Sequence, residues 1–169
     1  MKQEKEVWLR GKDVNGITAH LQPVGHALLQ AEEEIIILLE NLNAKYLWQT
    51  PAGCASPGFH LLHIAGVLDR LLTYAEEKKL TADQLDYLQQ ETHVQPVTKE
   101  ELLSKCKIQI NNTLERLKQF STINLTDKRN VGRSALPSTV IGLCTHAAEH
   151  TMRHVGQLLV TVRILNHKN

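Results

Sequence analysis

The sequence predicts an all-α protein whose long helices pack as a bundle in a single domain. Apolar residues recur at helical spacing over long stretches, and prolines and helix-start signals separate these stretches. β-Branched residues never cluster with strict alternation, so we expect no strand. A chain of 169 residues with 42% hydrophobic and 22% charged residues is long enough to bury one core.

The first two long helices are expected over the first half of the chain. One covers residues 20–43, and Pro23 is acceptable in its first turn. The second begins at Ser56 and Pro57, an N-cap followed by proline at the first helical position. It runs to about Lys79, where basic residues suit a helix C-terminus.

A short helix and a third long helix follow. The short helix starts at Thr81, which has capping-box spacing to the glutamine three residues later, and it reaches about Glu91. Pro96 breaks the helical pattern. The third long helix restarts at Thr98 and runs to about Phe120.

The last helix is expected after a polar, basic loop. Pro137 and Ser138 open it, and it runs to about Ile164. Residues 1–19 are expected to form an N-terminal extension packed on or beside the bundle. The single domain then spans residues 1–169.

Composition excludes several classes of function. Nineteen basic and 18 acidic residues leave a net charge of +1, and aromatic residues make up only 4%, so we expect no nucleic-acid partner. The apolar runs are too short for a membrane span, and the charged N-terminus is atypical of a signal peptide. The three widely spaced cysteines show no disulfide framework. We therefore expect a cytoplasmic protein.

The placement of the nine histidines is the most informative feature of the chain. His146, His150 and His154 follow one another at i, i+4 on the last helix. In projection, His154 falls within the apolar stripe, His150 lies at its edge, and His146 lies further out. On the second helix, His60 lies within the apolar stripe and His63 on its flank. The pattern alone does not choose between these two, but it indicates one metal ligand from this helix and two from the last.

Three neutral imidazoles would suit a divalent transition metal, zinc or nickel above all. Three protein ligands also leave a position for water, as in catalytic zinc sites. The competing interpretation is that the histidines only make hydrogen bonds to their neighbours. Residues 146–150 also match the HxxEH pattern of zinc peptidases. However, Glu149 projects toward solvent and no acidic residue follows His150, so we do not expect a peptidase.

Two segments together resemble the DinB-like family of metal-binding four-helix-bundle proteins. They are FHLLHIAG at residues 59–66 and HAAEHTMRHVGQ at residues 146–157. The resemblance covers nearly the whole chain in helix order and length. It implies a DinB-like four-helix bundle with one additional short helix. It also implies that His63, His150 and His154 hold the metal.

The resemblance extends to neighbouring residues and to function. It makes His60, His146 and Gln157 candidates for orienting the ligands or a bound substrate. It implies a metal-dependent enzyme acting on a small molecule, of the thiol S-transferase or hydrolase type, with a low-molecular-weight thiol as one substrate. Zinc or nickel is favoured over manganese or iron, and a homodimer is compatible with the family. The alternative is a non-catalytic metal- or ligand-binding bundle with a role in stress response or sensing.

Overall fold

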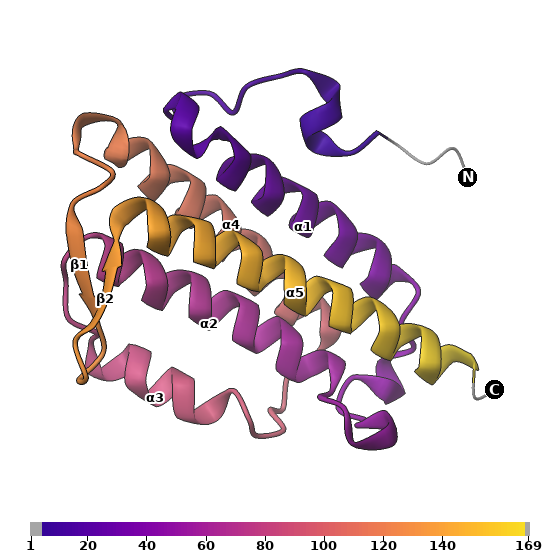
Figure 1. The fold of residues 1–169 in the computed structure, drawn as a ribbon. Coiled ribbons are helices and arrows are strands. Elements are labelled where there is room, and N and C mark those ends of the chain that lie inside the picture. The colour runs from indigo at the N-terminus through magenta and orange to yellow at the C-terminus, as the bar shows by residue number, and fades with distance from the viewer. Residues whose placement is uncertain (1–4, 168–169) are drawn as a thin grey trace.

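The computed structural model of the protein describes residues 5–167. Within these residues lie four long helices, one short helix and a two-stranded hairpin (Figure 1). In chain order they are α1 (Gln22–Glu40), α2 (Pro57–Ala75), α3 (Ala82–Gln90), α4 (Lys99–Gln119), β1 (Lys128–Val131), β2 (Leu136–Thr139) and α5 (Val140–His167). The predicted all-α fold, a four-helix bundle with one additional short helix, is confirmed.

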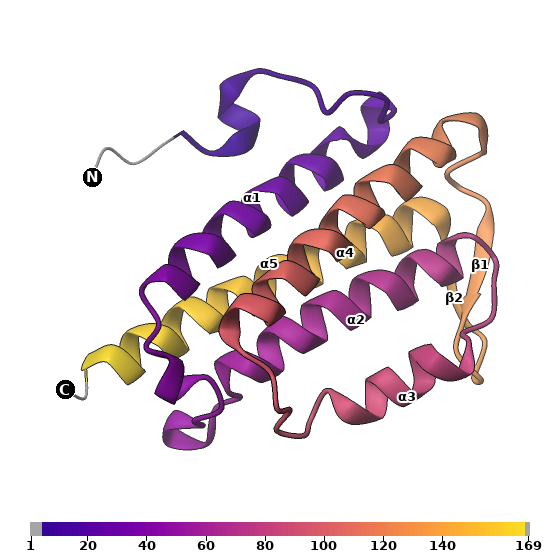
Figure 2. The same cartoon turned by 180° about the vertical axis from the view of Figure 1, so that it is seen from behind.

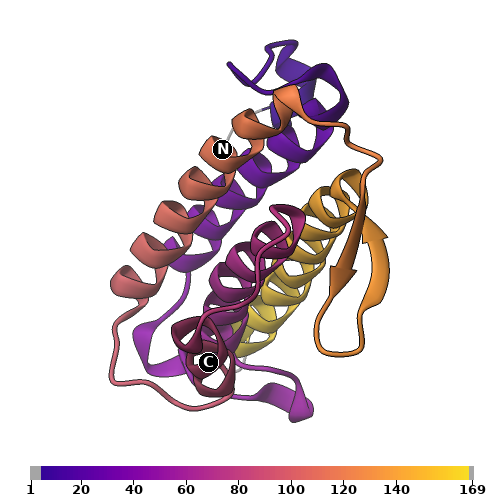
Figure 3. The same cartoon turned by 90° about the vertical axis from the view of Figure 1, so that its left-hand side faces the viewer.

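The four long helices form a bundle in which α1 and α2 each pack against both α4 and α5. Figures 1 and 2 show that α2 and α4 run in the same direction, while α1 and α5 run in the opposite one. The short helix α3 makes this order possible, because it carries the chain back along the outside of α2 before α4 begins. The hairpin covers one end of the bundle (Figure 3).

Several helix starts follow the predicted capping signals. The Ser56 hydroxyl accepts a hydrogen bond from the Phe59 N–H (3.2 Å) at the start of α2. Thr81 and Thr98 form complete capping boxes at the starts of α3 and α4. Pro23 lies in the first turn of α1, where its missing N–H is not needed.

The second helix ends earlier than predicted, at Ala75 rather than near Lys79. Glu77 adopts a left-handed backbone conformation with φ 61°. The N–H of Lys78 then donates to the carbonyl of Thr73 (3.0 Å), which closes the helix end. Glycine usually occupies a position with this conformation. Because Glu77 occupies it here, the sequence contains no signal for the helix end.

The predicted start of the last helix and the expected absence of strands are wrong. Pro137 and Ser138 lie in β2, which pairs antiparallel with β1, and α5 begins at Val140 and extends beyond Ile164. The strands have four residues each and are largely exposed, so they carry no alternating apolar pattern. Pro137 is tolerated because each strand of a two-stranded hairpin has an unpaired edge.

The described part of the N-terminal extension lies against α1. Val7 is buried, and its N–H donates to Gln30 Oε1 (2.9 Å). The guanidinium of Arg10 makes two bonds to the Glu33 carboxylate, at 2.7 and 2.6 Å. Residues 1–4 of the expected extension and residues 168–169 lie outside the described residues, so a domain spanning the whole chain stays a prediction.

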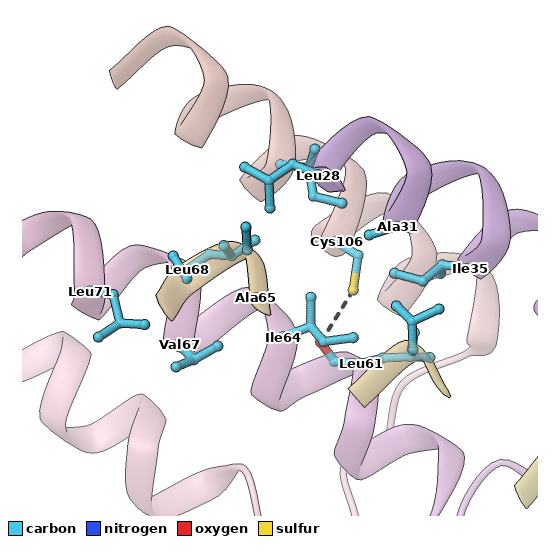
Figure 4. Packing of buried hydrophobic residues seen from close by; sticks show 14 of the residues in the cluster. Leu28, Ala31, Ile35, Leu61, Ile64, Ala65, Val67, Leu68, Leu71 and Cys106 are labelled. Carbon is cyan, nitrogen blue, oxygen red and sulfur yellow. Dashed lines mark hydrogen bonds between the residues drawn. The ribbon is translucent and has the colours of Figure 1, made fainter. Parts of the chain in front are cut away.

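The core fills the space between the four long helices (Figure 4). Ile35, Leu61, Ile64 and other apolar side chains are fully buried there. Cys106 lies among them and donates a hydrogen bond from Sγ to the Leu61 carbonyl (3.2 Å). Burial raises the pKa of this thiol to about 12, so it packs as a small apolar group. None of the described helices is long and apolar enough to span a membrane.

Candidate metal centre

Four imidazoles meet in the seam between α2 and α5. Nε2 of His63 lies 2.9 Å from Nε2 of His150, and Nδ1 of His60 lies 2.9 Å from Nδ1 of His154. The rings of His63 and His154 also approach, with centroids 4.5 Å apart. Each helix contributes two histidines because a spacing of three or four residues places side chains on one helical face.

The three predicted metal ligands are brought together by this packing. One donor atom each of His63, His150 and His154 lies within 4.8 Å of the other two. Two nitrogens that bind one ion at roughly 2.0–2.1 Å lie about 3 Å apart, close to the observed separation of His63 and His150. The donor type and the spacing therefore fit a divalent transition metal.

A buried carboxylate from outside the bundle, Glu91, completes the cluster. Its Oε2 lies 2.8 Å from Nδ1 of His63, and its two oxygens accept bonds of 2.5 and 3.3 Å from Arg70. Glu91 is 2% exposed and Arg70 is 7% exposed. A carboxylate at Nδ1 keeps the proton there, which leaves the lone pair on Nε2 facing the other histidines.

Sequence reasoning missed Glu91, because it follows a short polar helix and no spacing links it to a histidine. One indirect signal exists at Gly66, three residues after His63 on α2. A Cβ on Gly66 would lie 2.0 Å from Glu91 Oε1 and 2.5 Å from the Arg70 guanidinium. Only glycine leaves room for the Arg70–Glu91 ion pair at this position.

The surroundings favour the neutral form of His60, His150 and His154. Burial, followed by the neighbouring His63, lowers the pKa of His60 to about 4 and that of His154 to about 3. Burial and the same neighbour also lower the pKa of His150. Nδ1 of His150 is buried and has no hydrogen-bond partner in the described part of the chain. Near pH 7 each of these three rings is neutral and keeps one nitrogen lone pair that a metal can use.

A family model of the DinB superfamily matches residues 27–158. The chain belongs to the DinB superfamily. The matched region contains the three clustered histidines and Glu91. Members of the DinB superfamily often bind metal, and the histidine cluster is compatible with such a site. A search of curated proteins finds no significant match.

Two of the other residues to which the DinB resemblance gave roles lie away from the cluster centre. His146 is exposed, and its Nδ1 lies 3.4 Å from the Glu149 carboxylate. Gln157 is exposed, and no hydrogen bond among the described residues joins it to the cluster. His60, in contrast, is buried and touches His154. His60 bonds to the predicted ligand His154, and the ring of His146 lies 5.3 Å from that of the predicted ligand His150, so the orienting roles stay predictions.

The HxxEH segment is not arranged as a peptidase site. Glu149 is exposed and pairs with Arg153, one turn further along α5. Its carboxylate belongs with His146 and His150 on the outer face of the helix, rather than with the cluster of His63 and His154. The expectation that this DinB member is not a peptidase stays a prediction.

Proposed function

We propose that the protein is a metal-dependent enzyme acting on a small molecule by thiol S-transfer or hydrolysis. The observation that carries the proposal is the cluster of His63, His150 and His154, with a buried carboxylate behind His63. A divalent ion held by three imidazoles keeps a further position and lowers the pKa of a water or thiol bound there.

The chain's own residues would set the geometry of this site. Glu91 holds a proton on Nδ1 of His63, and His60 fixes the ring of His154 through their Nδ1 contact. The ring of Phe59 stacks on His63 at 5.3 Å and an interplanar angle of 12°, which covers one face of that imidazole. These contacts limit ring rotation and reduce the access of water.

The proposal extends to the metal and the partners. Three neutral nitrogen donors favour zinc or nickel over manganese or iron. A low-molecular-weight thiol is the proposed substrate of the transferase form, because a metal-bound thiol is readily deprotonated. The net charge of +1 supports a protein without a nucleic-acid partner. A cytoplasmic location without membrane association and a homodimer are part of the same proposal.

A second candidate function is a non-catalytic metal- or ligand-binding bundle with a stress-response or sensing role. One observation favours it. Glu91 is the carboxylate that touches the cluster, and both of its oxygens already bond to Arg70 and His63. Within residues 5–167, the other acidic group near the three histidines is Glu149, which is exposed on the outer face of α5 and pairs with Arg153.

Both proposed functions involve a metal bound at the histidine cluster, so the metal content of the protein tests both. We expect about one divalent ion per chain in protein purified without a histidine tag, and its loss in His63→Ala and His154→Ala. His26→Ala is the matched control, because His26 contacts the Lys12 carbonyl (2.9 Å) outside the cluster. Chelation should lower the Tm of the wild type and leave that of His154→Ala unchanged.

Full metal retention in both cluster variants would contradict the ligand assignment. Assays with a small thiol and an electrophile, and with hydrolysable esters and amides, separate the two functions. Turnover that is lost on chelation and restored by the metal supports the enzyme. Saturable metal binding without turnover in any of these assays supports the sensing or binding role.

A further inference from the structure

A cavity lies between α2, α3 and α4, apart from the histidine cluster. It has a volume of about 510 Å³, within the range of small-molecule sites. Its walls include Ala65, Gly66 and Tyr87. Arg70 also lines it, and the ion pair of Arg70 with Glu91 stands between the cavity and His63.

The cavity exists because α3 runs beside α2, outside the four-helix bundle, and contributes only the partly buried Tyr87 to the core. No residue of α3 itself is buried, and Leu85 and Leu88 are 39% and 42% exposed. Polar bonds attach the helix instead: the Gln84 amide donates to Asp69 (2.6 Å), and the Tyr87 hydroxyl donates to the Leu62 carbonyl (3.1 Å). Figures 1 and 2 show α3 beside α2 and outside the four-helix bundle.

Most charged groups that line the cavity already have partners within the protein. Asp69 pairs with Arg116 (2.8 Å), and Arg70 pairs with Glu91. The Glu101 carboxylate accepts hydrogen bonds from the N–H and hydroxyl of Thr98 in the capping box of α4. The charges of Asp69 and Arg70 are thus balanced by ion pairs, whereas the exposed Glu101 carboxylate keeps its negative charge.

Lys105 and Gln109 of α4 offer hydrogen-bond donors to a ligand. The Lys105 ammonium lies 4.9 Å from the centroid of the Tyr87 ring and makes no ion pair among the described residues. Nε2 of Gln109 is buried and has no hydrogen-bond partner in the described chain. The two residues are four apart on one helix, so their side chains lie on the same face. A buried donor without an acceptor is costly, and a bound acceptor would relieve that cost.

We propose that this cavity is a second binding site, for a small carboxylate with an apolar body. The carboxylate would accept hydrogen bonds from Lys105 and Gln109, and the apolar body would lie against Ala65, Tyr87 and Ile108. An anion complements Lys105, the lining cation without an ion pair among the described residues, while solvent screens the exposed Glu101 carboxylate. The small side chain of Ala65 and the lack of a side chain at Gly66 leave space for the apolar part. The site does not depend on the metal.

Titration calorimetry of the full chain with octanoate, octanol and octylamine tests the site. We expect saturable octanoate binding, with octanol about fivefold weaker and octylamine weaker still. Lys105→Met should weaken octanoate about fivefold and leave octanol unchanged, and Gln109→Leu should also weaken octanoate. Lys107→Met is the matched control, because Lys107 lies on the same helix but does not line the cavity.

Amide NMR shifts locate the ligand, and they should concentrate at Gly66, Tyr87 and Lys105. Octanoate binding should persist in His150→Ala, which separates this site from the proposed metal centre. The proposal is overturned if octanoate does not saturate, if octanol binds equally well, or if Lys107→Met weakens binding as much as Lys105→Met. Loss of octanoate binding in His150→Ala would place the ligand at the histidine cluster instead.

Discussion

The two sides of α2 contrast sharply in chemistry. One side carries Leu61, Ile64 and Leu68, which are fully buried among apolar side chains around Cys106 (Figure 4). The other side carries His60 and His63, which meet two more imidazoles from α5. Both sides pack against neighbouring helices, but the second buries polar imidazoles where the first buries apolar side chains.

The histidine side contains features that a stability optimum would not select. Buried imidazoles have lowered pKa values, one ring nitrogen of His150 has no partner within residues 5–167, and a buried carboxylate and guanidinium support the cluster. Replacing such polar groups with apolar ones is often neutral or stabilising. One face of α2 therefore stabilises the fold, whereas the other carries the candidate metal site.

The largest expected effect is a difference in stability between substitutions at two adjacent residues, Ile64 and His63, which lie on the two sides of α2. Ile64→Ala removes a fully buried side chain and should reduce the free energy of unfolding by about 2–5 kcal/mol. His63→Ala should change the stability of the metal-free protein less, because it removes a group whose burial was costly, while it abolishes metal binding. Urea denaturation with chelator present measures both effects.

Ile108→Ala is the control for the core substitution, because Ile108 is 59% exposed and should cost roughly 0.5 kcal/mol or less. If the metal-free His63→Ala protein lost as much stability as Ile64→Ala, the histidine face would be a structural core like the other.

A smaller effect is expected from glycine substitutions in α2 and α5. Gly66→Ala places a Cβ against the Arg70–Glu91 ion pair and the Tyr87 ring, so it should cost about 1–3 kcal/mol and weaken metal binding by displacing Glu91. Gly156→Ala meets nothing within 4 Å and should stabilise α5 by about 0.5–1 kcal/mol. Thermal unfolding and metal titration of both variants check the pair. Unchanged metal affinity in Gly66→Ala would show that Glu91 does not support the site.

The smallest effect is a dependence of metal-free stability on pH. The pKa values of His60 and His154 are lowered to about 4 and about 3 in the folded protein. The unfolded chain, with ordinary histidine pKa values near 6.5, therefore takes up protons first as the pH falls. The contribution of these residues to stability is intact above about pH 7, and it declines below about pH 6.5 until the lowered pKa values are passed.

Denaturation of the metal-free protein at pH 7.5, 6.0 and 5.0 measures this decline. The matched variant His60→Leu fills similar space without titrating, so its stability should fall less between pH 7.5 and 5.0. If the stability of the variant and the wild type fell equally between pH 7.5 and 5.0, protonation of His60 would not contribute to the decline.

Local sequence patterns specify where the helices lie and which histidines are candidate metal ligands. Apolar periodicity and the caps at Ser56, Thr81 and Thr98 are local properties, so they specify helix type and most starts without tertiary information. The i, i+4 histidines of α5 are likewise neighbours on any helix. Periodicity left the choice between His60 and His63 open. The family resemblance selected His63, and metal analysis of the variants has yet to test that assignment.

Tertiary structure alone decided what surrounds these residues. Glu91 reaches His63 because α3 returns along α2, and no local pattern encodes a contact across 28 positions. The hairpin has no alternating apolar pattern that would predict its strands. The sequence therefore predicts a helix start at Pro137, which lies in β2. The cavity beside Lys105 depends on how far α3 lies from α4. Each of these features arises from contacts between segments distant in sequence, whereas the caps and periodicities arise within one helix.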